Sequence, residues 1–253
     1  MFKILCMGIG YEHEPDFAVE RPEGYPHYLA LLIRSKCKIM VDGEIKSFPQ
    51  NTFVLYDAGV PQYYAADGET YIDDWMQFEC EPELIESFAF PLNSPIVVPE
   101  WMHPEQYFSL ICNTFFRCYN DDAVINSLIT AMLTDFSKTL TDSKAQIPLY
   151  GQLVQLRQRI YAAPQNNWNV TEIAAEFHVS VSYFQRLYRK AFGIPIMKDV
   201  IYRRVEAAKT LLHSTDMTVD EIAERCGYSV TEHFSRQFKQ YTGLSPAKWR
   251  KEQ

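Results

Sequence analysis

Short apolar runs separated by turn-forming residues fill the first hundred positions of the chain. The run at residues 28–34 predicts a buried strand. Asp42-Gly43 separates two further runs at residues 38–41 and 45–48, and this dipeptide is typical of a tight hairpin turn. Other strands are expected at residues 52–56, 62–64 and 70–79. Strands that recur about every ten residues predict a small antiparallel barrel or sandwich.

The pattern changes to helical spacing from about residue 104. Apolar side chains recur three and four positions apart between residues 125 and 140. Such a stripe either packs against its own barrel or pairs with a second subunit, and the pattern leaves both alternatives open. We expect a homodimer through these helices, with the contact formed by Ile125, Leu128, Ile129, Met132, Leu133 and Phe136.

Clear helix start signals follow a polar segment at residues 141–148, which is the best candidate for a linker. A long helix is predicted at residues 197–212, where Arg204 interrupts an otherwise apolar face. Ser245 precedes a proline at the first position of another helix. Three pairs have the spacing of capping boxes: Asn169 and Glu172, Thr218 and Glu221, and Ser229 and Glu232.

The second half of the chain contains an internal repeat. Glu172-Ile173-Ala174 recurs 49 positions later as Glu221-Ile222-Ala223, and Phe184 and Arg186 recur 50 positions later as Phe234 and Arg236. A period of about 50 residues in a helical region indicates a duplicated supersecondary unit.

Each repeat has a short helix, a tight turn and a second helix. Gly227 suits the left-handed conformation of the second turn, and His178 occupies the corresponding position in the first. This order is that of a helix-turn-helix, whose second helix enters the major groove of DNA. Two units joined by one helix could read two successive major-groove faces about 34 Å apart.

Polar side chains lie near the start of each second helix, where base edges are contacted. Arg suits guanine, Gln suits adenine and Glu suits the cytosine amino group. A solvated face is the alternative for any one residue, but two matched faces favour base contacts. The expected DNA contacts are Ser182, Gln185, Arg186, Arg189, Thr231, Glu232, Ser235, Arg236 and Lys239, whereas Phe184, Leu187, Tyr188, Phe234 and Phe238 are expected in the core.

The charge is divided unevenly along the chain. The net charge is −8, from 24 Lys and Arg against 32 Asp and Glu. Residues 1–150 contain 9 basic and 22 acidic residues, and residues 151–253 contain 15 and 10. The second part therefore has a net charge of +5 and attracts phosphate, which indicates two modules with different partners.

The cysteines and the apolar segments restrict the environment of the protein. The six cysteines, Cys6, Cys37, Cys80, Cys112, Cys118 and Cys226, include no CxxC pair and are expected to be buried thiols in a reducing compartment. Residues 1–10 are expected to form a first strand of a cytoplasmic protein, because no cleavage pattern follows them. No run approaches the roughly 18 apolar residues of a spanning helix, so no membrane partner is expected.

Seventeen positions at fixed spacing carry a family resemblance. They are Arg204-Val205, Ala208, Leu211-Leu212, Ile222-Ala223, Gly227-Tyr228, Phe234, Arg236, Phe238-Lys239, Gly243, Pro246 and Trp249-Arg250. Over about the last hundred residues this pattern resembles the AraC/XylS family of transcription regulators. The resemblance implies double-stranded DNA as a partner and base contacts from both second helices, and RNA polymerase is a further candidate partner. His178 and Trp249 depart from the Gly and Tyr that are usual at their positions.

Three segments of the first half add a second resemblance: Arg21-Pro22-x-Gly24, Gly59-Val60-Pro61-x-x-Tyr64 and Trp75-Met76-Gln77-Phe78. They are similar to the sensor domain of the arabinose-responsive branch, a cupin-like barrel followed by dimerising helices. This implies a small carbohydrate as the effector, bound by Arg21, Tyr64, Asp73 and Trp75. Because Asp73 stands where that branch has His, the sugar need not be the same. The alternative is a core Trp and Tyr beside a surface Arg.

Cupin-like barrels also include metal enzymes, and this alternative finds few ligands here. The expected strands contain only His27, while His13 and His103 lie outside them, so a shell of two or three His cannot be assembled. The side chains of Asp73 and Asp74 are expected on opposite faces of a strand. We therefore expect no enzyme, no metal and no cofactor. A dimeric regulator without an effector is the remaining alternative.

Together these features predict an α+β multidomain protein. It would have a cupin-like antiparallel β-barrel that binds the effector at residues 1–103, a helical dimerisation segment at 104–140, a linker at 141–148 and an all-α DNA-binding domain with two helix-turn-helix units at 149–253. The expected function is that of a sequence-specific transcription regulator that responds to a small molecule, a carbohydrate.

Overall fold

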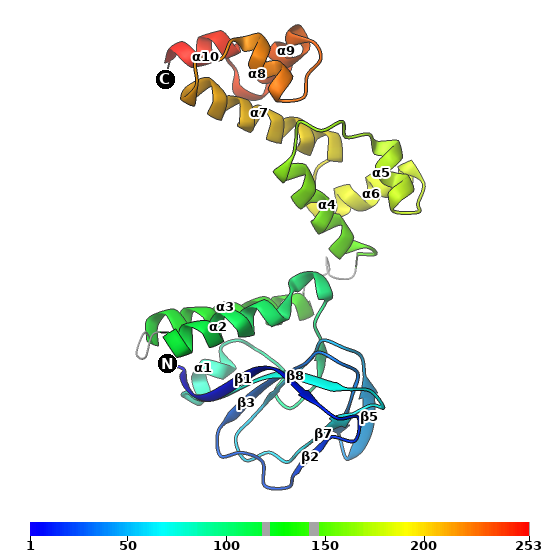
Figure 1. Cartoon of the computed structure of the whole chain (residues 1–253), viewed down its shortest axis with the longest axis vertical. Coiled ribbons are helices and arrows are strands. Elements are labelled where there is room, and N and C mark those ends of the chain that lie inside the picture. The colour runs from blue at the N-terminus through cyan, green and yellow to red at the C-terminus, as the bar shows by residue number, and fades with distance from the viewer. Residues whose placement is uncertain (118–121, 142–146, 253) are drawn as a thin grey trace. The chain divides into compact units, whose positions relative to one another are not determined.

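The computed structural model describes residues 1–117, 122–141 and 147–252 of the chain. The fold separates into two compact units, Met1–Asp142 and Ser143–Gln253. The first unit combines β-sheets with helices, and the second unit is helical (Figure 1). Residues 142–146 of the expected linker lie outside the described residues.

Two antiparallel sheets form the body of the first unit. The larger sheet contains, in spatial order, β1 (Lys3–His13), β8 (Tyr71–Glu79), β3 (Tyr28–Ile33), β6 (Thr52–Tyr56) and β9 (Ile96–Val97). The smaller sheet contains β2 (Ala18–Arg21), β7 (Gln62–Ala66), β4 (Cys37–Val41) and β5 (Glu44–Phe48). Asp42 and Gly43 between β4 and β5 have φ of 54° and 79°, which is the backbone of the expected tight hairpin. Strands β2 and β9 were not predicted, because both are short.

The larger sheet is buried on both faces, which explains the apolar run in β3. Ala30 and Leu32 point to a core shared with helices α1 (Pro82–Glu86), α2 (Pro104–Arg117) and α3 (Asp122–Thr141). Leu29 and Leu31, with the opposite parity, belong to a second core between the two sheets. A short 3-10 turn, η1 (Glu100–Met102), precedes α2. The order of layers is therefore helices, larger sheet and smaller sheet.

The apolar stripe of α3 packs against its own unit. Ile125, Ile129, Met132, Leu133 and Phe136 are at most 6% exposed, and Leu128 is half-buried in the same core. The Phe136 ring lies 5.1 Å from that of Phe53 in β6. The prediction that these six side chains form a dimer contact is wrong, because the sheet already covers the stripe. Helical periodicity showed that one face is buried, but not which surface buries it.

The second unit contains seven helices within residues 147–252: α4 (Tyr150–Ala162), α5 (Val170–Glu176), α6 (Val181–Phe192), α7 (Ile196–Ser214), α8 (Val219–Arg225), α9 (Thr231–Thr242) and α10 (Pro246–Glu252). They surround two separate cores. The first core includes Phe184 and Leu187 with Val200 from α7, and the second includes Phe234 and Phe238 with Val205 from the same helix. Helix α7 therefore belongs to both halves of this unit.

The caps of these helices agree only in part with the sequence signals. Thr218 and Glu221 form the expected capping box of α8. Asn169 caps α5 by accepting a hydrogen bond from the backbone N–H of Thr171, but its side chain bonds Glu172 directly instead of completing a box. The expected box at Ser229 is wrong, because α9 begins at Thr231 and its N-cap is Val230, without a side-chain hydrogen bond. Ser229 is one residue too far out to cap the helix.

The cysteines and the helix lengths complete this description. Cys37, Cys112 and Cys226 are buried free thiols. Cys6 is exposed, contrary to the prediction, and it lies at a register shift between β1 and β8. Cys118 lies outside the described residues. In the parts of the chain that the structure describes, no helix is long and apolar enough to cross a membrane.

Candidate functional site

The two repeats of the second unit have the same local geometry. In the first, α5 is followed by His178 with φ of 54°, and in the second, α8 is followed by Gly227 with φ of 83°. The same backbone hydrogen bond closes each turn, from Val179 N–H to the carbonyl of Ala174 at 3.1 Å and from Tyr228 N–H to the carbonyl of Ala223 at 2.9 Å. The repeat read from the sequence is thus a repeat in three dimensions.

The polar faces of α6 and α9 point away from the two cores. Phe184, Leu187, Tyr188, Phe234 and Phe238, which the sequence assigned to the core, are all buried. Among the expected DNA contacts, Ser182, Gln185, Arg186, Arg189, Glu232, Arg236 and Lys239 are exposed, and Thr231 and Ser235 are half-buried. The fold therefore presents all nine side chains on the two second helices.

The cationic side chains of these faces are available for a ligand. The Arg186 guanidinium lies 5.0 Å from the ring centroid of Tyr183, which holds it along α6. No ion pair within residues 147–252 engages Arg186, Arg189, Arg236 or Lys239. These four positive charges therefore have no carboxylate partner in this part of the chain and can meet an anionic ligand.

A buried carboxylate fixes the position of α6. Asp199 on α7 is 0% exposed and accepts hydrogen bonds from Arg157 Nε at 2.7 Å, Tyr188 Oη at 2.8 Å and Tyr161 Oη at 3.0 Å. These donors come from α4 and α6, so one side chain ties three helices together. Burial and the bond to Asp199 both raise the pKa of Tyr188. Sequence reasoning missed this cluster, because Asp199 lies roughly opposite the centre of the apolar face of the predicted helix, which is formed by Arg204 and Ala208.

Arg204 has a comparable structural role in the second half of the unit. Its guanidinium donates to the carbonyl oxygens of Pro164 and Asn166, each at 2.8 Å, and lies 5.3 Å from the ring centroid of Tyr228. Gly227 approaches the carbonyl of Gln165 so closely that a Cβ atom would collide with it. The loop before α5 is therefore held against the turn of the second repeat, which explains both the Arg within an apolar face and the Gly in this turn.

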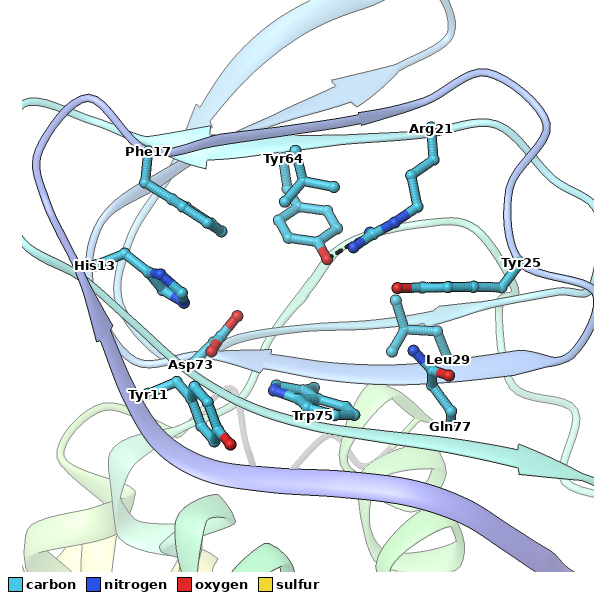
Figure 2. A pocket seen from close by; sticks show the side chains of 11 residues that line it. Tyr11, His13, Phe17, Arg21, Tyr25, Leu29, Tyr64, Asp73, Trp75 and Gln77 are labelled. Carbon is cyan, nitrogen blue, oxygen red and sulfur yellow. Dashed lines mark hydrogen bonds between the residues drawn. The ribbon is translucent and has the colours of Figure 1, made fainter.

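The first unit contains a cavity of about 280 Å³ between its two sheets. The four residues expected to contact an effector, Arg21, Tyr64, Asp73 and Trp75, all line it (Figure 2). Arg21 lies on β2 and Tyr64 on β7 of the smaller sheet, and Asp73 and Trp75 lie on β8 of the larger one. The remaining lining residues are Tyr11, His13, Phe17, Val19, Tyr25, Leu29 and Gln77.

The smaller sheet places a cation at one side of this cavity. Arg21 Nη1 donates a hydrogen bond to Tyr64 Oη at 2.8 Å, drawn as a dashed line in Figure 2. The guanidinium also lies 4.4 Å from the ring centroid of Tyr25. These contacts orient Arg21 but leave donors of its planar fork free for a ligand.

The larger sheet contributes an acid to the same cavity. Asp73 is 4% exposed, and its Oδ1 atom has no hydrogen-bond partner among the described residues. Burial, and next the charge of Asp74, raise the pKa of Asp73 to about 7. Asp74 points to the other face, as expected, where it accepts a hydrogen bond from Gly10 N–H at 2.6 Å.

The position of His13 corrects one expectation. It was placed outside the strands, but β1 continues to His13, and its ring stacks on Phe17 with 3.9 Å between centroids at the wall of the cavity. His27, expected within a strand, lies one residue before β3. Among the described residues no group of three or more His, Cys, Asp and Glu is arranged to hold a metal ion.

Strand alternation could have identified further lining residues. Asp73, Trp75 and Gln77 occupy every second position of β8 and therefore share one face. Tyr11 and His13 do the same at the end of β1, and Tyr11 is paired with Asp73 in the sheet register. Gln77 was not selected from the sequence, but alternation along β8 could have predicted it. Tyr11 and His13 could be predicted only if the full length of β1 were known.

A close backbone approach accounts for two of the three sensor-like segments. Gly24 has φ of 63°, and a Cβ atom there would collide with the carbonyl of Val60. The neighbouring Gly59 N–H donates to the carbonyl of Tyr25 at 2.6 Å. The loop after β2 and the loop before β7 therefore touch beside the cavity, and this contact orients Tyr25 toward Arg21.

Comparison with known proteins matches the second unit to a family. Residues 173–252 match the model of a helix-turn-helix domain. The Msm operon regulatory protein of Streptococcus mutans is 29% identical over 126 residues, which are 49% of this chain and 45% of that protein. The chain thus matches about half the length of this relative.

A second relative aligns with almost the whole chain. The arabinose operon regulatory protein of Escherichia coli is 24% identical over 248 residues, which are 93% of this chain and 84% of that protein. Among solved structures, the C-terminal domain of AraT, a response regulator from Geobacillus stearothermophilus, is 31% identical and covers 42% of this chain and 86% of that chain, with a TM-score of 0.39.

Proposed function

The chain belongs to the AraC family of helix-turn-helix transcription regulators and not to a family of enzymes, and from this premise we propose that it is a cytoplasmic, sequence-specific DNA-binding regulator whose first unit binds a small effector. One observation carries the DNA-binding part of the proposal: two repeats with the same turn geometry each present an exposed polar and cationic helix face. A solvated surface helix has no reason to be matched in this way.

The two faces differ in the bases that they would select. Gln185 and Arg186 on α6 suit adenine and guanine, whereas Glu232 and Arg236 on α9 suit cytosine and guanine. Arg189 and Lys239 stand one turn further along each helix and would contact phosphate. The net charge of +5 on residues 151–253 supports this assignment, because phosphate attraction supplies affinity while base contacts supply sequence preference.

We expect selection from a pool of random duplexes by the full chain to enrich one preferred sequence. Two conserved patches about ten base pairs apart should emerge, because two recognition helices on one side of a duplex are separated by about one helical turn. Footprinting of the enriched duplex at fixed salt checks the result. A pool that shows no enrichment, despite measurable binding, would contradict the proposal.

The effector part of the proposal rests on the cavity of the first unit. Its volume of about 280 Å³ suits a monosaccharide, and Trp75 offers an aromatic face to the apolar side of a sugar ring. Arg21 and Asp73 supply polar groups on opposite sheets for hydroxyls. The name of the Escherichia coli relative, which refers to an arabinose operon, also favours a carbohydrate.

Trp75→Ala should abolish the thermal stabilisation of the full chain by a sugar that binds the intact protein. The substitution removes the main apolar surface for the ring but lies in a different unit from the DNA-binding helices. We therefore expect affinity for the selected duplex to stay unchanged in the absence of sugar. Thermal-shift titrations with and without a monosaccharide panel measure the effect, and equal shifts in both proteins would reject the cavity as the effector site.

A homodimer remains part of the proposal, but through other side chains than the buried stripe of α3. Leu110 and Phe116 on α2 are 53% and 69% exposed and offer an apolar surface for such a contact. We expect the intact full chain to sediment as a dimer and the Phe116→Ser variant to sediment as a monomer. A monomer in both cases would contradict the proposed contact.

A further inference from the structure

We propose that the effector of this protein carries a protonated amine that pairs with Asp73, which makes it an amine-bearing monosaccharide and not a neutral sugar. The inference rests on the proposed role of the cavity as an effector site. It is carried by the carboxylate of Asp73, which faces the cavity nearly completely buried and without a partner for Oδ1 among the described residues.

The two neighbouring carboxyl groups of β8 differ in this respect, and Tyr71 Oη is the other buried polar atom of the strand that has no partner among the described residues. The adjacent Asp74 is 1% exposed but accepts a hydrogen bond from Gly10 N–H at 2.6 Å and lies 3.7 Å from Arg34. A buried acid without a cation is costly, and proteins normally pair it or leave it protonated. The strand thus compensates one carboxylate within the protein and leaves the other facing the cavity.

The one arginine that lines the cavity does not fill this role. Arg21 lies on the opposite sheet, where it donates to Tyr64 and to Gln62 and stacks on Tyr25. Figure 2 shows Arg21 and Asp73 on different sides of the cavity. A ligand that spans the space would therefore meet an acid at one end and a guanidinium at the other.

The walls beside Asp73 also favour a cation. Tyr11, Phe17, Tyr64 and Trp75 surround the cavity, and aromatic faces attract a positively charged group while tolerating the apolar face of a sugar ring. An ammonium group would bond Asp73 and lie near these rings, while ring hydroxyls would face Arg21 and Gln77. Both polar ends of the cavity are then used by one small molecule.

The charge of an ammonium group explains why Asp73 would prefer an amine to a neutral hydroxyl. A hydroxyl can donate to Asp73, but it does not offset the cost of ionising a buried carboxyl group. An ammonium group does, because the opposite charge stabilises the ionised form. Hydrogen bonds to charged groups contribute about 1.5–3 kcal/mol, which corresponds to roughly tenfold to a hundredfold in affinity.

The test compares matched sugars on the full chain by isothermal titration calorimetry at pH 7. The probes are D-glucosamine and D-galactosamine, their neutral parents D-glucose and D-galactose, and the two N-acetyl derivatives. We expect at least one amine to bind roughly tenfold or more tightly than its parent and its N-acetyl derivative. Asp73→Asn, which keeps the shape of the side chain, should remove this preference, so that the amine, its parent and its N-acetyl derivative differ little in affinity.

Proton release on binding provides a second measurement. A sugar that is preferred only because of its shape would not change the protonation of Asp73. Because burial raises the pKa of Asp73 to about 7, the group is partly protonated in the empty cavity, and pairing with an ammonium group should lower its pKa and release a proton. Titrations at pH 6.5 in two buffers of different ionisation enthalpy measure this release. Tyr71 and, through its charge, Asp74 act on Asp73 from its own strand. Tyr11 and His13 on β1 and Tyr64 and Arg21 on the smaller sheet line the same cavity, so loss of the release in Asp73→Asn assigns it to Asp73.

The outcomes separate this inference from the function on which it rests. Tighter binding of an amine with proton release supports both. Equal or tighter binding of the neutral parents overturns the amine and leaves a neutral carbohydrate as the effector. Absence of binding by all six sugars overturns the carbohydrate effector and the amine with it, while DNA selection by the second unit stands or falls by its own test.

Discussion

Replacing Asp199 by Asn is expected to lower the free energy of unfolding of the second unit by about 3 kcal/mol. The substitution keeps the shape of the side chain but removes the charge that holds Arg157, and it places an amide N–H₂ where donors already point. Asp199 is fully buried, whereas the Arg157 side chain is 32% exposed. Because water can still reach Arg157, the loss should lie at the lower end of the range for a broken buried ion pair.

Glu176→Gln serves as the matched control, since it also removes one partner of an ion pair with an arginine. Arg159 and Glu176 lie 2.8 Å apart, but both side chains are about half exposed. Exposed pairs contribute about 0–1 kcal/mol, so unfolding should change little. Urea unfolding followed by circular dichroism compares the variants, and hydrogen exchange localises the loss to α4, α6 and α7. Similar losses in both variants would mean that Asp199 does not organise these helices.

Combining Arg186→Ala with Arg236→Ala should weaken binding to the preferred duplex by about 2–6 kcal/mol at fixed salt. Each arginine is expected to account for about 1–3 kcal/mol, because a bidentate contact with guanine is lost. The two residues lie on different helices with separate cores, so their effects should add. Fluorescence anisotropy with the selected duplex and its single-position variants measures the loss.

Random duplexes and Arg159→Ala provide the controls for this prediction. Arg159 is an exposed arginine on α4, outside the two polar faces, so its replacement removes one positive charge without removing a base contact. Affinity for the selected duplex should then change little, while the double variant should lose its preference among sequences. If the double variant lost as much affinity for random duplexes, both arginines would be phosphate contacts instead.

The helical repeat was the part of the fold most accessible from the sequence. Periodicity, caps and a repeated motif all describe local structure, and local structure decides where α5, α6, α8 and α9 form. The same reasoning misplaced the Ser229 cap by one residue, because Ser229 and Val230 both precede the helix and only the backbone decides which is its N-cap. Buried strands such as β3 were equally accessible, since an apolar run needs cover on both faces.

The contacts between elements were less accessible. The stripe on α3 has the same pattern whether a sheet or a second subunit covers it, so periodicity alone could not choose between them. The cluster around Asp199 joins residues up to 42 positions apart, and no local signal connects them. The cavity lies between these extremes: short motifs named four of its residues, and alternation along β8 implied Gln77, while His13 depended on how far β1 extends.

Helix α7 fixes the spacing and the relative rotation of the two helix-turn-helix units of the second unit. Val200 anchors it in one core and Val205 in the other, so no flexible joint separates them. In an α-helix each residue advances about 1.5 Å and turns about 100°. Inserting or deleting a single residue in α7 would therefore rotate one helix-turn-helix unit by about 100° relative to the other. The recognition faces of α6 and α9 can change during evolution to suit new operators, whereas the length of α7 cannot change without disturbing every operator at once.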